Sequence, residues 1–169
     1  MENNHTANSQ SGGKVLAMYD IRGIQDYIYR TPHIKDAMGA SLIIEDILKD
    51  ALNEACKNLK LKPEETDLEW EKGEEEEEVK PFKMSEKAVQ VLYIGGGNAY
   101  VIYNGNDLYR NINKIMSKYI IEHTYSLQLA AACVDVTDKY YNDYEKLRSK
   151  MDKVKAKMAG SKPLGALPI

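Results

Sequence analysis

The sequence AVQVLYIGGGNAYVIY, residues 88–103, decides how this chain folds. Its two ends, 88–93 and 99–103, are apolar and rich in the β-branched and aromatic residues that favour strands. The segment between them, IGGGN at 94–98, is typical of a tight turn, because glycine and asparagine readily adopt the backbone angles of short hairpins. The stretch therefore predicts a β-hairpin.

Two more strands and four helices are predicted around this hairpin. Apolar runs predict the strands, and apolar residues that recur every three or four positions predict the longer helices. The strands are expected at 14–19 and 127–136, and the helices at 24–29, from about 35 to just before 63, from about 107, and at 140–158.

The order of these elements is strand, helix, strand, strand, helix, strand, helix, with one short helix added after the first strand. It predicts an α+β fold of the ferredoxin-like βαββαβ type, with a four-stranded antiparallel sheet and an added C-terminal helix. In that topology the first and third strands are central and both crossover helices cover one face. The end of the first strand, at Asp20, is then expected at the same edge as the hairpin at 95–98.

Composition limits the class of protein and its organisation. The 169 residues suit one domain, and no apolar run approaches the ~20 residues of a membrane-spanning helix. The N-terminus lacks a secretion signal, so a cytoplasmic protein without a membrane partner is expected. We expect a disordered tail at 1–13, the domain at 14–159, and a linker into a downstream domain at 160–169.

The net charge of −3 is unevenly distributed. Residues 64–78 carry ten acidic side chains against Lys72, which leaves the remainder of the chain at +6. A run of like charges repels itself and buries little apolar surface. We therefore predict a solvated loop insertion at about 62–86, in a body whose mild positive charge is compatible with a nucleotide or nucleic acid.

Two motifs resemble one known family. The segment 19–29, YDIRGIQDYIY, is followed by Lys35 and Gly39-Ala40-Ser41, and it resembles the start of a palm domain in the polymerase/cyclase-like large subunit of type III CRISPR effector complexes. That family shows the pattern Asp-Ile-x-Gly-Ile-Gln-x-Phe-Ile before a lysine and small residues. The hairpin 93–100 resembles the family's Gly-Gly-Asp-Asp hairpin in its degenerate Gly-Gly-Gly-Asn form. The resemblance covers roughly residues 14–136.

The resemblance implies a nucleotidyl cyclase-like site whose chemistry is incomplete. Such palms hold two magnesium ions on carboxylates from the first strand and the hairpin, and these ions position a nucleoside triphosphate. Asp20 matches the first-strand carboxylate, with the Ile21 carbonyl as a second metal ligand, but Gly97 and Asn98 stand where the hairpin acids belong. We therefore predict a palm that is catalytically inactive by itself.

Binding of a nucleotide depends less on those acids. The resemblance implies a magnesium-bound nucleoside triphosphate as ligand, and a role in antiviral defence. Its implied partners are a second palm domain or a second copy of this chain, CRISPR effector subunits, or RNA. Asp20 is the implied metal ligand, and the implied nucleotide-binding residues are Asp20, Ile21, Gly23, Ile24, Gln25, Gly95, Gly96, Gly97 and Asn98.

Two alternatives remain open at the level of sequence. The three glycines could simply shape a hairpin, with no ligand near them. The whole chain could also be a ferredoxin-like interaction module that binds protein through its sheet edge or its last helix, without any nucleotide.

Overall fold

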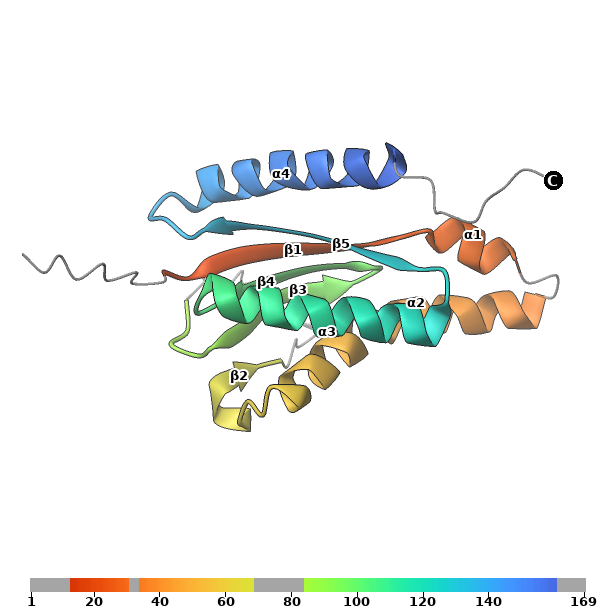
Figure 1. Ribbon diagram of the computed structural model, residues 1–169, viewed down its shortest axis with the longest axis horizontal. Coiled ribbons are helices and arrows are strands. Elements are labelled where there is room, and N and C mark those ends of the chain that lie inside the picture. The colour runs from red at the N-terminus through yellow and green to blue at the C-terminus, as the bar shows by residue number, and fades with distance from the viewer. Residues whose placement is uncertain (1–12, 31–33, 69–83, 161–169) are drawn as a thin grey trace, which may run out of the picture.

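The chain forms the predicted alternation of strands and helices. The computed structural model describes residues 13–30, 34–68 and 84–160 (Figure 1). Its elements are β1 (Val15–Arg22), α1 (Ile24–Tyr29), α2 (Ile34–Asn58), the 3-10 helix η1 (Pro63–Glu65), β2 (Thr66–Asp67), β3 (Val89–Gly95), β4 (Asn98–Tyr103), α3 (Asn106–Thr124), β5 (Gln128–Asp135) and α4 (Tyr140–Gly160). This order confirms the predicted α+β class.

The strands form one sheet in the order β2-β3-β4-β1-β5. The pairs β3–β4, β4–β1 and β1–β5 are antiparallel, and β4 and β1 are central, as the ferredoxin-like topology requires. All four predicted strands are present. The sheet differs from the prediction by one short strand, β2, which pairs parallel to β3.

Strand β2 lies inside the range predicted as a loop insertion, 62–86. Thr66 pairs with Val89, and the Ala88 N–H donates a hydrogen bond to the Glu65 carbonyl at 2.8 Å. A two-residue strand has no periodicity to detect, so only its pairing with β3 identifies it. The glutamate run 74–78, most of the predicted N-terminal tail and most of the predicted C-terminal linker lie outside the described residues.

The two faces of the sheet are covered by different helices. Helices α2 and α3 pack on one face and α4 packs alone on the other (Figure 1). Because side chains alternate along a strand, β1 contributes to both cores. Toward α2 and α3 it directs Val15, Ala17, Tyr19 and Ile21, whereas Leu16 belongs to the core under α4.

A hydrogen-bonded group of polar side chains joins the central strands to α3. The hydroxyls of Tyr19 and Tyr103 lie 2.7 Å apart, and the Tyr19 hydroxyl donates to Asn113 Oδ1 at 2.6 Å. Burial raises the pKa of both tyrosines, so they stay neutral. These bonds satisfy polar atoms that would otherwise be costly to bury.

Helix α4 is attached at both its start and its middle. Asp143 is 1% exposed and accepts hydrogen bonds from the N–H and hydroxyl of Thr137, each at 2.7 Å. Leu147 and Met151 are fully buried against the sheet, as their spacing predicted. Within the described ranges, no helix combines the length and the apolar character needed to cross a membrane.

Candidate functional site

The C-terminal end of β1 and the β3–β4 hairpin lie side by side at the same end of the sheet. Asp20 and Asn98 are paired residues on β1 and β4, and the Ile21 N–H donates a hydrogen bond to the Gly97 carbonyl at 2.8 Å. This confirms the predicted juxtaposition of Asp20 with the hairpin. The antiparallel pairing of two central strands is its physical cause.

Asp20 faces α4 and is already paired with cations. Its Oδ2 atom lies 2.6 Å from Lys155 Nζ on α4 and 3.7 Å from Arg22 Nη1 on β1. Asp20 is 8% exposed, so both interactions occur at the margin of the core, where charges are screened less than in open solvent. Asn98 lies directly opposite Asp20 and therefore on the same face of the sheet.

The turn of the hairpin depends on two glycines with positive φ. Gly96 has φ +60° and Gly97 has φ +85°. A Cβ atom on Gly97 would lie 2.8 Å from Ile24 Cδ1, whereas a Cβ atom on Gly96 would meet no atom within 4 Å. The left-handed backbone and the contact with Ile24 therefore both disfavour a side chain, including a carboxylate, at position 97, while the space around Gly96 is open.

The residues from the end of β1 to the first turn of α1 differ in how accessible they are. Gly23 has φ +90° and begins α1, and its carbonyl accepts a hydrogen bond from the Tyr27 N–H at 3.0 Å. Ile24 is partly buried under the hairpin, and the Ile21 N–H is used in the hydrogen bond to Gly97. Gln25 is exposed in the first turn of α1. The structure thus joins β1, α1 and the hairpin, but leaves only some of the predicted residues accessible to a ligand.

The residues present do not fit a two-metal site. Magnesium prefers several oxygen ligands with carboxylates among them, and here Asp20 provides one carboxylate that Lys155 already neutralises. Gly97 and Asn98 add no negative charge. Among the residues that the structure describes, no group of three or more His, Cys, Asp or Glu side chains could hold a metal ion.

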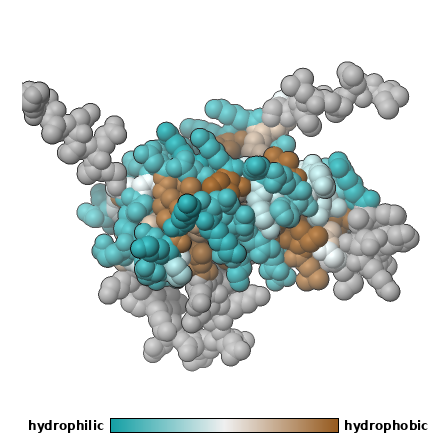
Figure 2. Space-filling model, turned by 60° about the horizontal axis from the view of Figure 1, so that its bottom comes forward, coloured by the Kyte–Doolittle hydropathy of each residue, from teal (hydrophilic) through white to brown (hydrophobic). Residues whose placement is uncertain are grey.

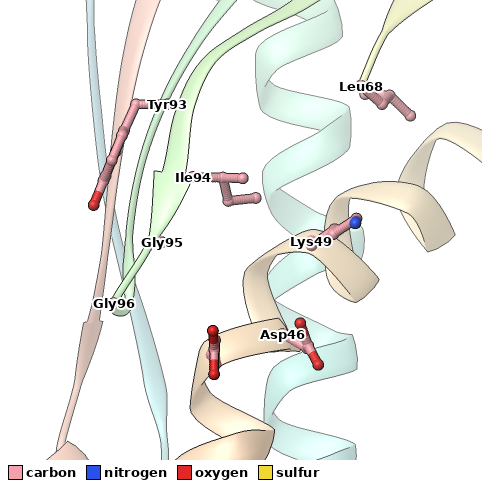
Figure 3. A pocket seen from close by; sticks show the side chains of 8 residues that line it. Asp46, Lys49, Leu68, Tyr93, Ile94, Gly95 and Gly96 are labelled. Atoms are coloured by element: carbon pink, nitrogen blue, oxygen red, sulfur yellow. The ribbon is translucent and has the colours of Figure 1, made fainter. Parts of the chain in front are cut away.

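A cavity of about 450 Å³ lies on the other side of the hairpin, between α2 and the end of β3. Ile94 points toward α2 and its Asp46 and Lys49, whereas Tyr93 points away (Figure 3). The residues that line this cavity include Glu45, Asp46, Lys49, Ile94, Gly95 and Gly96. Two carboxylates against one ammonium group disfavour a phosphate there.

Lys155 is the site residue that sequence reasoning did not single out. Lysines at 150, 153, 155 and 157 are equally compatible with a solvated helix face and with phosphate contacts. Lys155 follows Met151 by four positions, which places both on the same side of α4. The spacing alone could not show that this side would lie over Asp20.

No family model matches the sequence, and the comparison with curated proteins found no match. The fold, in contrast, is similar to solved structures of Csm1. A Csm1–Csm4 cassette in complex with one ATP matches 94% of this chain, with a TM-score of 0.61 and 19% identity. The Csm1–Csm4 subcomplex of a type III-A CRISPR–Csm interference complex matches 90% of this chain, with a TM-score of 0.60 and 21% identity. Csm1 of T. onnurineus matches 86% of this chain, with a TM-score of 0.58 and 20% identity.

The chain spans about a fifth of the length of each of these Csm1 chains. At such identities the similarity shows a common fold. That fold agrees with the α+β class predicted from the order of strands and helices.

Proposed function

We propose that this chain is a CRISPR-associated palm-like domain, related to nucleotidyl cyclases and polymerases, that binds a nucleotide and is catalytically inactive by itself. The observation that carries the proposal is the pairing of Asp20 with Asn98 at a glycine hairpin. A fold shared with Csm1 supports it, and a Csm1–Csm4 cassette in complex with ATP makes a nucleoside triphosphate the expected ligand class.

Electrostatics favour the α4 side of the hairpin for the phosphate groups. On that side two cations, Arg22 and Lys155, surround the single carboxylate of Asp20. The cavity on the α2 side has the opposite balance of charge. A triphosphate is therefore expected beside Arg22, with its ribose or base close to the open backbone at Gly96.

We expect the purified chain to make no cyclic nucleotides, oligoadenylates or primers from nucleoside triphosphates with magnesium or manganese. Two-metal phosphoryl transfer needs carboxylates on both strands, and Asp20 is the only acidic residue among 19–22 of β1 and 95–98 of the hairpin. Chromatography of labelled ATP after long incubation measures this. Metal-dependent turnover that disappears in Asp20→Ala would contradict the proposed inactivity.

Titration with ATP is expected to shift the amide resonances of Ile21–Gln25 and of Gly95–Asn98. Gly96→Val should abolish these shifts, because its side chain fills the open space at the turn. Gly96→Ala is the matched control for the backbone strain at φ +60°, and it should weaken binding less than valine. Lys157→Ala, on an exposed position of α4, should leave the titration unchanged.

A titration in which saturating ATP moves no amide in either segment would contradict the proposed nucleotide site. The interaction module would then be the better account. A specific surface favours it, because a groove beside the hairpin is lined by Ile24, Ile28 and Ile44. Figure 2 shows hydrophobic patches within a mostly hydrophilic face.

A further inference from the structure

Lys155 is one of the reasons why the hairpin edge does not fit a metal ion, beside the missing carboxylates at Gly97 and Asn98. We propose that the Lys155 ammonium group replaces the divalent cation at Asp20, so that this chain binds the phosphates of a nucleoside triphosphate without a metal. The inference rests on the nucleotide site proposed above, and it adds that the site is metal-independent.

The geometry is that of an internal counter-ion. Lys155 Nζ lies 2.6 Å from Asp20 Oδ2, on a carboxylate whose side chain is 12% exposed. An ammonium group has three N–H donors, so a bond to Asp20 leaves two of them for other acceptors. The Lys155 side chain is 29% exposed and can therefore be reached from solvent.

The packing of α4 fixes the backbone of Lys155 close to Asp20. Leu147 and Met151, on the same helix, are fully buried against the sheet, and Lys155 follows Met151 by one helical turn. Helix α4 runs along the sheet on the side opposite α2 and α3 (Figure 1). Displacing Lys155 from Asp20 would therefore require the end of α4 to move or the side chain to adopt another rotamer.

The charges separate a phosphate ligand from a metal ligand. A divalent cation at Asp20 would share one carboxylate with Lys155 and would also face Arg22, so two positive groups would repel it. The same two groups attract a phosphate, and both can donate charge-assisted hydrogen bonds to its oxygens. In this arrangement Lys155 neutralises Asp20, and Asp20 does not hold a metal ion.

The test is ATP binding to the full chain by calorimetry, in magnesium and in EDTA. We expect binding with the same Kd in both buffers. Lys155→Gln should raise the Kd for ATP about ten- to a hundredfold through the loss of a charge-assisted contact. Lys157→Gln is the matched control and should not change it. Asp20→Asn should lower the Kd, because it removes a carboxylate that competes with phosphate for Lys155.

Asp20→Asn distinguishes the possible outcomes most sharply. Binding that needs magnesium and disappears in Asp20→Asn would overturn the inference while preserving the proposed nucleotide site. Absence of ATP binding in both buffers would overturn the nucleotide site itself, and the inference with it. Thermal unfolding verifies that each variant is folded. If Lys155→Gln is unfolded, Lys155→Arg, which keeps the charge, should still bind ATP in EDTA, and loss of that binding in the folded arginine variant would also overturn the inference.

Discussion

Leu147→Ala is expected to lower the free energy of unfolding by about 2–5 kcal/mol, the range typical of large-to-small substitutions in a protein core. Leu147 is 0% exposed and packs with Leu16 and Ile102 in the core between α4 and the sheet. Alanine would forfeit the burial of these atoms and leave a cavity in a small core that few other side chains can fill. The effect measures how firmly α4 is held over the site.

Chemical denaturation of the wild type and Leu147→Ala measures the difference. Lys153→Ala, at an exposed position on the same helix, is the matched control, and a change within about 0.5 kcal/mol is expected for it. If Leu147→Ala were as mild as the control, α4 would not be packed on the sheet in solution. The position of Lys155 over Asp20 would then lose its support.

The second large effect is expected at the hairpin. Gly97→Ala should destabilise the fold by about 1–3 kcal/mol, because a residue with a Cβ atom in left-handed backbone costs roughly 1–2 kcal/mol. The new Cβ would also lie 2.8 Å from Ile24 Cδ1, so that side chain must move. Gly96→Ala carries backbone strain without the collision and should be the milder of the two.

Ile24→Val provides a direct test of this collision, because the substitution removes the Cδ1 atom that the new methyl group would meet. In a double-mutant cycle, Gly97→Ala should cost less in the Ile24→Val background than in the wild type. Equal costs in both backgrounds would show that backbone strain alone accounts for Gly97. Position 97 could then accept a carboxylate as readily as any other left-handed position.

Much of the fold followed from patterns that are local in the chain. Two apolar runs around a glycine turn predicted the hairpin at 88–103, and a short apolar run before Asp20 predicted β1. Because four strands and their crossovers allow few topologies, the order of elements was enough to bring Asp20 to the hairpin. The strand β2 was not predicted, because two residues in an acidic stretch are too few to show the alternation of apolar and polar residues that indicates a strand.

The residues of the candidate site divide in the same way. Asp20, Gly97 and Asn98 could be identified from motifs, because each has a fixed place on a strand or turn. The motifs could not show that the space beside Gly97 is occupied, because the Ile24 side chain that occupies it comes from α1. The motifs also could not identify the ion-pair partner of Asp20, because Lys155 lies 135 positions further along the chain among several similar lysines.

The sequence by itself determined the α+β class, the central pair of strands and the lack of a second carboxylate at the hairpin, because residue type and periodicity are properties of the chain alone. Only the tertiary structure decided which cation neutralises Asp20 and which side chain occupies the space beside Gly97. Both depend on how a helix packs against the sheet. That packing is set by the burial of apolar side chains such as Leu147 and Ile24, which orient each helix and carry its polar residues to positions that no local pattern encodes.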